Sequence, residues 1–481
     1  MVRFVLFVPL PAHTQTCPHS NPIPKGEISM TMSMSRRKFL QFAAATTSLG
    51  LVAQGCAAPV APGASPGGET TAPSQAANSV EMWAPHPLED NIGITEFVAE
   101  NFTPDHPDIQ FTFTRVPSEW EQKFRTAAAG GQLPDIFAVD GINVPAYASR
   151  GLCAELDELV VPADVLDDYY PSARAEMLYR GTTYAVVLET NSQAVRLNLD
   201  LMDEAGVSAP ETWDELVTVG QQLTVDQNGN TANSADFDNN AVVRWAMETW
   251  CCLGEGATWM ITPWIWMNGG DILDENTREV KIAEEPAVEA IQFLSDLVKV
   301  HGIWPRAGAV TAGPEGTWYG QLVAMSWTGA FDLANLTQNN PPNFAWDVAP
   351  FPHPAGGEAI SGVGGWLFSA WRDGRNLEST MSLMNFMTTP EWHRHVSQYG
   401  YAVTGRRSIA EERLEEVPQL QVFLDAMLTG RARPRSNQYP LITEALQQAF
   451  DASIFGDTPV EQALVEAEGK IADALAQEEA E

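Results

Sequence analysis

Tryptophan is the residue type in this sequence whose number and spacing could most clearly do chemistry. Trp250, Trp259, Trp264 and Trp266 fall within seventeen residues and lie just before a glycine-rich turn at 268–270. An indole face can stack on the apolar face of a sugar ring, and comparable aromatic pairs contribute about 0.5–1.5 kcal/mol each. The alternative is that these large side chains fill a hydrophobic core, as tryptophan mostly does.

Carboxylate side chains could bind the hydroxyl groups of the same solute. Asp140 follows a predicted strand at 135–139, and Glu189 lies about fifty residues further along the chain. Hydrogen bonds to charged groups contribute about 1.5–3 kcal/mol, more than bonds between neutral groups. The tryptophans and carboxylates together therefore predict a binding site for a sugar.

Motifs of covalent catalysis, nucleotide binding and metal binding are absent from the sequence. It contains no GxSxG nucleophile elbow and no Walker A, HExxH or GxGxxG pattern. His393 and His395 stand two positions apart on a predicted helix, so they point to different faces. Asp226 begins a stretch that only faintly resembles a calcium loop, because its glycine is fourth rather than sixth, and a polar turn is the alternative. We expect no catalytic residue, no metal and no cofactor.

The five cysteines do not form a disulfide scaffold, and no CxxC pair is present. Cys251 and Cys252 are adjacent, and Cys153 lies far from them in the sequence. Three arrangements stay open in an oxidising compartment: a bridge between the adjacent pair, a bridge from one of them to Cys153, or buried free thiols.

The charge balance excludes several classes of partner. The chain of 481 residues has 62 acidic and 27 basic residues, which gives a net charge of −35. Binding to nucleic acid or to an anionic membrane surface needs lysine and arginine. The hydrophobic content of 44% is ordinary for a globular protein, and the length predicts two or three structural units.

Strands and helices that could position these side chains alternate along the chain. Apolar strands are predicted at 80–83, 109–113 and 135–139. Capping boxes at 118–121 and 212–215 predict the starts of two helices. Further helices are predicted to begin near Pro286, Pro390 and Pro459. This alternation predicts an α/β protein, and the length of the body predicts two lobes.

The first eighty residues predict an export signal and a tether. The arginine pair at 36–37 and the apolar stretch at 39–55 have the layout of a signal sequence and resemble a twin-arginine signal. The segment 53–56 resembles a lipobox in which Cys56 receives the lipid, and an ordinary cleavage site is the alternative. We predict a leader and export signal at 1–55, with an over-long start, and a lipid-anchored flexible linker at 56–79.

Five ordered stretches of the body resemble family 1 of the bacterial extracellular solute-binding proteins, the lipoprotein receptors of carbohydrate ABC importers. Two positions depart from the family pattern, because Val187 replaces a proline and Leu197 replaces a tyrosine. The resemblance runs from about Val80 to the end of the chain. It is carried by residues 127–136, 181–191, 197–216, the pair of segments 268–271 and 320–325, and the pair of segments 364–366 and 386–392.

The resemblance implies a two-lobed periplasmic-binding-protein-like fold (type II). Each lobe would be an open sheet flanked by helices, and a multi-strand hinge would join the lobes. By the family pattern, lobe one takes residues 80–190 and 348–388. Lobe two takes residues 191–347 and 389–481.

The resemblance also implies which residues line a cleft between the lobes. Glu189 sits where family members place a hinge-side carboxylate, and Phe331 sits where they place a stacking aromatic. Trp120 could equally be the core partner of Phe124. The full set of predicted ligand-binding residues is Trp83, Trp120, Asp140, Glu189, Asn191, Trp250, Trp264, Trp266, Trp327, Phe331, Trp366, Tyr401, Arg406 and Tyr439.

The family implies an exported receptor, tethered to the outer face of the cell membrane, that makes and breaks no bond. It would bind a sugar or oligosaccharide as a monomer and deliver it to an ABC permease and its ATPase. The acidic surface favours a neutral sugar over an anionic solute. An arginine in the cleft would reverse that preference, and the candidates are Arg406, Arg407, Arg433 and Arg435.

Two alternatives to a sugar receptor stay open. The first is a secreted carbohydrate-active hydrolase or lyase, because paired carboxylates and tryptophans suit that chemistry too. The second is the same receptor fold with a cleft for a non-sugar solute, such as a glycerol phosphate.

Overall fold

The computed structural model describes residues 78–248, 254–274, 276–306, 309, 313–398 and 403–480. The chain divides into two compact units, 1–75 and 76–481, and all described residues belong to the second unit. The predicted export signal, Cys56 and nearly all of the linker therefore lie outside the described residues. Trp250, Tyr401, Cys251 and Cys252 also lie outside them.

Five strands form the first sheet, in the order β2-β1-β3-β13-β6. β1 is parallel to β2 and β3, whereas β13 is antiparallel to β3 and β6. Alternate residues of β1, namely Val80, Met82 and Ala84, are fully buried, as the strand period of two requires. The strands are β1 (Ser79–Ala84), β2 (Gln110–Arg115), β3 (Ile136–Asp140), β6 (Val186–Val187) and β13 (Trp366–Ala370).

Five further strands form the second sheet, in the order β11-β7-β10-β9-β8. β7 is antiparallel to β10 and β11, and β9 is parallel to β10. Every residue of β7 and of β10 is buried, which is typical of central strands covered on both faces. The strands are β7 (Gln193–Asn198), β8 (Val225–Asp226), β9 (Val242–Glu248), β10 (Val323–Gly329) and β11 (Trp346–Ala349).

Two short ladders and two crossovers complete the strand topology. β12 (Gly362–Val363) pairs in parallel with β14 (Arg431–Ala432), and β4 (Leu178–Tyr179) pairs with β5 (Thr182–Thr183). The chain passes from the first sheet to the second between β6 and β7, and it returns between β11 and β13. The polar cluster described below lies beside these connections.

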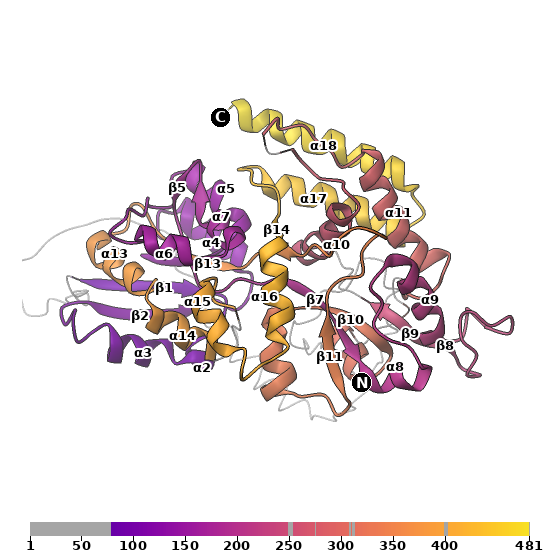
Figure 1. Ribbon diagram of the computed structural model, residues 1–481. Coiled ribbons are helices and arrows are strands. Elements are labelled where there is room, and N and C mark those ends of the chain that lie inside the picture. Colours follow the sequence, from indigo (N-terminus) through magenta and orange to yellow (C-terminus); the bar gives the residue numbers. More distant parts are fainter. Residues whose placement is uncertain are drawn as a thin grey trace, which may run out of the picture. The chain divides into compact units, whose positions relative to one another are not determined.

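Helices separate most of the strands along the chain (Figure 1). No helix in the described ranges combines the length and the apolar composition that a membrane span needs. The helices are α2 (Leu88–Ile92), α3 (Ile94–Asn101), α4 (Trp120–Ala129), α5 (Val144–Ser149), α6 (Ala163–Asp168), α7 (Pro171–Met177), α8 (Leu199–Ala205), α9 (Trp213–Leu223), α10 (Glu255–Met267), α11 (Glu285–Lys299), α12 (Gly313–Tyr319), α13 (Leu377–Phe386), α14 (Pro390–Gln398), α15 (Arg407–Ala410), α16 (Leu420–Thr429), α17 (Tyr439–Phe450) and α18 (Val460–Ala480).

One of the two predicted capping boxes forms. Thr212 accepts a hydrogen bond from the backbone N–H of Glu215, whose carboxylate accepts one in return from the Thr212 N–H, so α9 begins as predicted. The box predicted at 118–121 is wrong. Glu119 precedes α4 with a φ of 53° and makes no capping bond with its side chain. Glu119 rather than Ser118 is the residue before the first helical position, and the Ser118 hydroxyl accepts a hydrogen bond from the Lys123 side chain at 3.4 Å.

Two main hydrophobic cores accompany the two sheets. The first core contains strand residues of β1, β3 and β13, and the second contains residues of β7, β10 and the helices α10, α11, α17 and α18. The predicted assignment of all residues 389–481 to lobe two differs from this packing. Trp392, Phe423 and Met427 are buried in the first core, whereas Ile442 and Leu464 are buried in the second. The order of the family motifs along the sequence does not determine which of the two cores each helix in residues 389–481 packs against.

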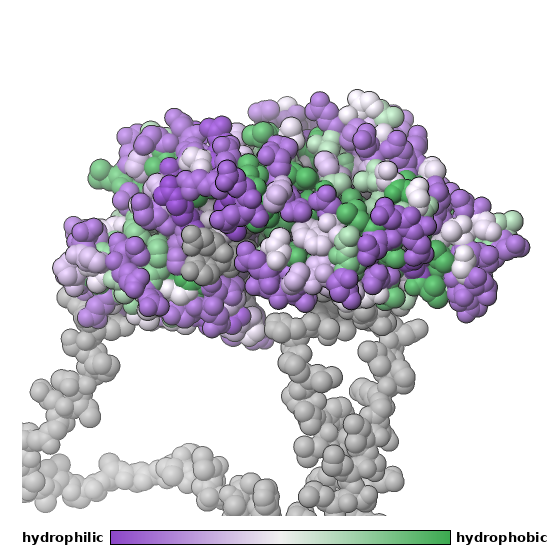
Figure 2. All heavy atoms as spheres, turned by 60° about the horizontal axis from the view of Figure 1, so that its bottom comes forward, coloured by the Kyte–Doolittle hydropathy of each residue, from purple (hydrophilic) through white to green (hydrophobic). Residues whose placement is uncertain are grey.

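The surface of the described chain is mainly hydrophilic on the face that Figure 2 shows, with smaller hydrophobic areas between the polar ones. The exposed large apolar side chains are scattered along the sequence rather than gathered in one segment. Such single exposed residues are normal for a globular protein.

Candidate functional site

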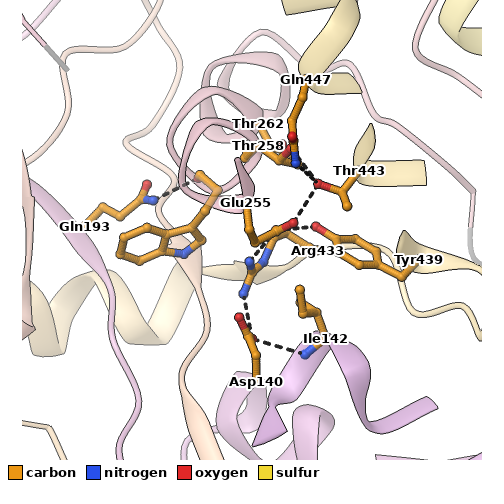
Figure 3. A network of polar contacts seen from close by, with 11 residues as sticks. Asp140, Ile142, Gln193, Glu255, Thr258, Thr262, Arg433, Tyr439, Thr443 and Gln447 are labelled. Atoms are coloured by element: carbon orange, nitrogen blue, oxygen red, sulfur yellow. Dashed lines mark hydrogen bonds and ion pairs between the residues drawn. The ribbon is translucent and has the colours of Figure 1, made fainter. Parts of the chain in front are cut away.

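A buried guanidinium group joins residues of the two cores (Figure 3). Arg433 follows β14, and only 4% of its side chain is exposed. Its Nη1 donates to Glu255 Oε1 at 2.6 Å, and its Nη2 donates to Asp140 Oδ1 at 3.5 Å. Asp140 ends β3 of the first sheet, whereas Glu255 begins α10 of the second core. Arg433 therefore bridges the two cores with one ion pair on each side.

The charges in this cluster shift one another's protonation. Burial raises the pKa of Asp140 to about 6, although the charge of Arg433 acts in the opposite direction and Glu255 adds to the rise. Burial alone would lower the pKa of Arg433, but Asp140 and Glu255 outweigh it and raise that pKa above its usual value. Arg433 therefore stays charged at every physiological pH.

Helix α17 fixes the carboxylate of Glu255. The Tyr439 hydroxyl donates to Glu255 Oε1 at 2.5 Å, and the Thr443 hydroxyl donates to Oε2 at 2.6 Å. Gln447 in turn donates to Thr443 at 2.9 Å (Figure 3). The structure thus brings Tyr439 into the cluster, as a buried residue that positions Glu255.

A second buried carboxylate, Glu176 of α7, lies beside the arginine. Its side chain is 1% exposed, and its Oε1 has no hydrogen-bond partner among the described residues. Burial raises the pKa of Glu176 to about 8, against the opposing effect of Arg433. Glycines make room for it. A Cβ on Gly141 would lie 2.7 Å from Glu176 Oε2, and a Cβ on Gly364 would lie 2.4 Å from Arg433 Nη2.

Glu189 and Asn191 form a pair at the connection between the sheets. The Asn191 Nδ2 group donates to Glu189 Oε2 at 2.6 Å, and Glu189 is 5% exposed. Burial raises the pKa of Glu189 to about 7; the Asn191 hydrogen bond opposes this rise, and the negative charge of Asp140 adds to it. The backbone of Asn191 exchanges two hydrogen bonds with Gly364. Both predicted residues therefore lie next to the glycine-rich segment that also packs on Arg433.

Aromatic side chains flank the polar cluster. Trp366 is half-buried and is the register partner of Asp140 in the neighbouring strand, so the two side chains leave the sheet on the same face. The ring of His86, which follows β1, meets the Trp366 indole edge-on with 4.5 Å between centroids. Burial lowers the pKa of His86 to about 4, so this ring is neutral at physiological pH.

A second aromatic pair joins Trp259 of α10 to Phe331, which follows β10. Phe331 is 36% exposed, and its ring lies 6.2 Å from that of Trp259. Gln193 donates to the backbone carbonyl of Trp259 at 2.8 Å (Figure 3). Trp259 belongs to the tryptophan-rich segment of the sequence and is not among the predicted ligand-binding residues.

Four of the predicted tryptophans are buried, and their side chains pack on other residues of the cores. Trp264 stacks on Trp327 at 5.1 Å inside the second core, and Trp120 packs on Phe124 in the first. Trp266 donates to Asp271 at 3.1 Å beneath the guanidinium of Arg431. The burial of all four side chains favours the core-packing alternative over contact with a solute. Nearly every residue of α10 is buried, so a local cluster of tryptophans fills the core instead of facing a solute.

Two other predicted ligand-binding residues, Arg406 and Trp83, have hydrogen-bond partners outside the polar cluster. Arg406 pairs with Asp168 at 2.8 Å and donates to the Thr388 carbonyl, so it is a structural ion pair and not part of the cluster. Trp83 is half-buried in β1 and donates to Glu81 at 2.7 Å. Within the described part of the chain, no hydrogen bond joins Trp83 to a residue of the polar cluster.

The remaining polar features of the sequence have structural partners. His393 is buried against the Tyr169 hydroxyl, 2.9 Å away, and burial lowers the pKa of His393 to about 3. Asp226 accepts backbone hydrogen bonds from Asn228, Asn230 and Asp238, which makes a polar turn. Cys153 is a buried free thiol whose pKa burial raises to about 12.

Sequence reasoning missed three residues of the cluster, namely Glu176, Glu255 and His86. Glu255 lies inside the tryptophan-rich segment, and His86 lies directly after the first predicted strand. The glycines at 141 and 364–365 were the available signal for Glu176, because small residues next to strand ends often mark close packing.

Solved structures share the fold along most of the chain. A cyclic α-maltosyl-1,6-maltose binding protein of Arthrobacter globiformis superposes with a TM-score of 0.69 at 22% identity, over 83% of this chain and 99% of that one. The substrate-binding protein Lmo0181 of Listeria monocytogenes, in complex with cycloalternan, gives 0.70 at 20% identity, over 83% and 98%. The two sheets, joined by crossovers beside a polar cluster, therefore form a two-lobed fold that this chain shares with those solute-binding proteins.

The sequence relatives place the chain in one family. A probable ABC transporter-binding protein of Deinococcus radiodurans is 23% identical over 323 residues, which are 65% of this chain and 74% of the relative. A maltotriose-binding protein of Pyrococcus abyssi is 28% identical over 29% of each chain. The family model described as bacterial extracellular solute-binding protein matches residues 89–394. The chain belongs to that family, and it is an exported solute-binding protein.

Proposed function

We propose that this protein is the extracytoplasmic receptor of an ABC importer and that it binds a sugar or oligosaccharide where the two cores meet. The observation that carries the proposal is the cluster of Asp140, Glu189, Asn191 and Trp366 beside the connections between the sheets. Carboxylate and amide groups bind hydroxyls, and a half-buried indole can cover a sugar ring.

A ligand that touches both lobes stabilises their closed arrangement by its differential affinity for that arrangement. The closed receptor then delivers its solute to a membrane permease. Relatives and structural neighbours support a sugar or sugar alcohol, because the solutes of those proteins are maltotriose, mannitol, cycloalternan and a cyclic maltosyl maltose.

An anionic solute is disfavoured. Arg433 is the candidate arginine that reaches the cluster, but Asp140 and Glu255 already bind its guanidinium group. Arg406 is engaged by Asp168 in the first core. A structural neighbour, UgpB of Mycobacterium tuberculosis, was solved with glycerophosphocholine, so the same fold accepts a solute that is not a sugar.

We propose that the protein makes and breaks no bond in its solute. The competing function is a hydrolase, in which one carboxyl group donates a proton and a second carboxylate acts as base or nucleophile. Asp140 and Glu189 are the pair that such an enzyme would use. Release of reducing ends from oligosaccharides by the purified protein would favour the hydrolase, and recovery of the intact ligand favours the receptor.

We also propose that the exported protein is monomeric and is held at the outer face of the membrane by a lipid on Cys56. The sequence around 53–56 supports this proposal. Mass spectrometry of the mature N-terminus tests it. A diacylglyceryl cysteine in the wild type, and a soluble exported product from the Cys56→Ser variant, are the expected results. An unmodified N-terminus at any other position would contradict the tether.

Thermal unfolding of the full chain against a panel of sugars, polyols, sugar phosphates and amino compounds tests the receptor. A ligand that binds only the folded state stabilises it by about 2.7 kcal/mol at one hundred times its Kd. We expect one sugar to raise the midpoint and to be recovered unchanged. If no sugar raises the midpoint while a sugar phosphate does, the sugar proposal fails and the fold assignment stands.

A further inference from the structure

Arg433 lies in a segment through which the chain crosses from the first core to the second. Residues 430–438 connect α16, whose Phe423 is buried in the first core, to α17, whose Ile442 is buried in the second. Asp140 of the first sheet, Arg433 and Glu255 of α10 meet at what we call the junction of the lobes, with bonds of 3.5 Å and 2.6 Å. A movement that separates α10 from β3 by several ångströms would break at least one of these bonds.

A third carboxyl group lies beside the same guanidinium group. Arg433 Nη2 and Glu176 Oε1 stand 2.4 Å and 3.3 Å from the position that a Cβ on Gly364 would take, so the two side chains are neighbours. Glu176 is 1% exposed, and its Oε1 has no hydrogen-bond partner among the described residues. Arg435 brings a second positive charge near this carboxyl group. Three carboxyl groups therefore share two guanidinium groups here.

A fourth carboxyl group, that of Glu189, adds to the excess. Glu189 is 5% exposed, and its charge interacts with that of Asp140. Repulsion between like charges is stronger in a protein interior than in water. The titratable and charged groups that face Asp140 are Glu121 of α4, Glu176 of α7, Glu189 after β6, Glu255 of α10, Tyr439 of α17 and Arg433. Arg433 is therefore the cation among mainly acidic neighbours.

The second core covers the first sheet at the junction. Helix α17 lies against residues 141–143, which directly follow Asp140, and the Asp140 side chain is 21% exposed. Separation of α17 from this turn would admit water to Asp140 and to Arg433. Water weakens the repulsion between carboxylates because its dielectric constant is high. The carboxylates therefore favour separated lobes, and the charge of Arg433 favours joined lobes.

We propose that Arg433 is the counter-charge that allows the two lobes to close, and that protons on the neighbouring carboxyl groups can replace it. This inference rests on the proposed receptor function, because it concerns the closure that a solute stabilises. It adds a residue that controls closure without contact with the solute.

The protonation of Asp140 gives this proposal a direction with pH. Burial raises the pKa of Asp140 to about 6, and the charge of Arg433 opposes that rise. An aspartate in water has a pKa of about 3.9, so the joined lobes hold the Asp140 proton more tightly than separated lobes do. Acid should therefore favour closure, most of all in a variant that lacks Arg433, where nothing opposes the rise from that side.

Small-angle X-ray scattering of the full chain without solute measures the separation of the lobes. Arg433→Met should increase the radius of gyration at about pH 7.5. The ratio of separated to joined molecules should rise about tenfold or more, because a charged hydrogen-bond donor is lost. Transfer to about pH 5 should return the radius to the wild-type value. Arg394→Met, which breaks an exposed ion pair with Glu412, should leave the radius unchanged at both pH values.

A second substitution separates the effect of charge from that of shape. Asp140→Asn removes one carboxylate and keeps the size of the side chain. Arg433→Met combined with Asp140→Asn should therefore have a smaller radius at about pH 7.5 than Arg433→Met alone, which a mere loss of packing would not produce. If Arg433→Met does not fold, the wild type provides the test. Its radius should increase between about pH 5 and pH 8.5, as Asp140, Glu189 and Glu176 lose their protons.

The scattering measurement needs no solute, so it tests the role of Arg433 separately from the receptor function. A wild-type radius for Arg433→Met at about pH 7.5 overturns the inference and leaves the sugar receptor in place. An expansion that neither acid nor Asp140→Asn reverses overturns it too, because Arg433 would then act through packing. Reversible opening in a chain whose unfolding midpoint no sugar raises supports the role of Arg433 and overturns the proposed sugar receptor.

Discussion

Arg433 is the residue at which polar contacts from the two cores converge, and its energetics follow from its burial. Desolvation of an arginine and two carboxylates offsets much of their Coulomb attraction, so the intact cluster adds little net stability. Removal of the guanidinium is different, because it leaves the partly buried carboxylates of Asp140 and Glu255 without their cation. The loss of one partner therefore changes the free energy of unfolding more than the presence of the whole cluster does.

Arg433→Met should lower the free energy of unfolding by about 1.5–3 kcal/mol, since it leaves two partly buried carboxylates without their charged hydrogen-bond donor. Urea unfolding monitored by tryptophan fluorescence measures the change. Arg394→Met is the matched control, because the Arg394–Glu412 pair is almost half exposed on both sides. It should cost less than about 1 kcal/mol. Similar losses for both variants would show that Arg433 makes no special contribution.

Glu189 should make stability depend on pH in a predictable direction. Burial raises its pKa to about 7, above the value of 4.5 for an exposed glutamate, so the folded chain holds the proton more tightly than the unfolded chain does. The contribution of Glu189 to folding is therefore most favourable below about pH 4.5 and declines as the pH rises towards 7. The stability of Glu189→Gln relative to wild type should rise by roughly 1–3 kcal/mol between these limits. If the stability difference between Glu189→Gln and wild type did not change with pH, the result would contradict the burial of the Glu189 carboxyl group.

Asp140, Glu189, Asn191, Trp366 and Tyr439, which the sequence predicts as site residues, lie in or beside one cluster. Their contact with a solute stays a prediction. The ion pairs were not predictable, because Arg433 lies 293 positions from Asp140 and 178 positions from Glu255. No local spacing can pair residues that only the folded chain brings together.

At the scale of the elements, the glycine-rich segment that contains β12 shapes the site. Gly365 lies so close to the connection between the sheets that a Cβ would meet the Glu189 carbonyl oxygen at 2.1 Å. That neighbour is backbone and cannot rotate away. The side chain is therefore excluded for steric reasons, and the same packing holds Glu189 and Asn191 in place.

Gly365→Ala should destabilise the chain by about 1–3 kcal/mol, the cost of overpacking, and should weaken solute binding. Gly469→Ala in α18 is the control. Nothing lies within 4 Å of its added Cβ, and alanine favours a helix, so that variant should be about 0.5–1 kcal/mol more stable than wild type. Denaturation midpoints with and without ligand measure both effects. If Gly365→Ala were as stable as wild type, the backbone around Glu189 could move away from the added Cβ without cost.

Helix α10 shows why the tryptophans could not be assigned from sequence. Ten of its thirteen residues are buried, so the helix has no polar face to indicate which side meets a solute. A helix buried all round carries little information in its periodicity. Trp264 and Trp266 were therefore assigned to the ligand from their residue type alone, whereas the helix places them in packed surroundings.

Trp264→Ala and Phe331→Ala should distinguish a residue that stabilises the core from a residue that binds the solute. Trp264 is fully buried, so its truncation should cost about 3–5 kcal/mol of stability. Phe331 is 36% exposed, and its truncation should change stability by less than about 1 kcal/mol. If Phe331 stacks on the solute, the same variant should bind about 3- to 10-fold more weakly. Loss of stability without loss of affinity would return Phe331 to a structural role.

At the scale of the whole molecule, the alternation of strands and helices predicted two α/β lobes, and the fold of the solved relatives agrees. The division of the C-terminal region was not predictable. Residues of α14 and α16 join the first core, whereas α17 and α18 join the second, because long-range packing decides where a crossing helix settles. Arg433 lies between those two groups of helices in the sequence, where the chain changes from one core to the other.

The central claim is that the solute binds where the two cores meet. Hydrogen–deuterium exchange of the full chain, with and without the sugar that raises its unfolding midpoint, tests this claim most directly. We expect slower exchange in residues 188–193 and 362–366, and also in residues 255–259 and 431–439, so that protection appears on both sides of Arg433. Protection confined to segments of a single core would contradict the account.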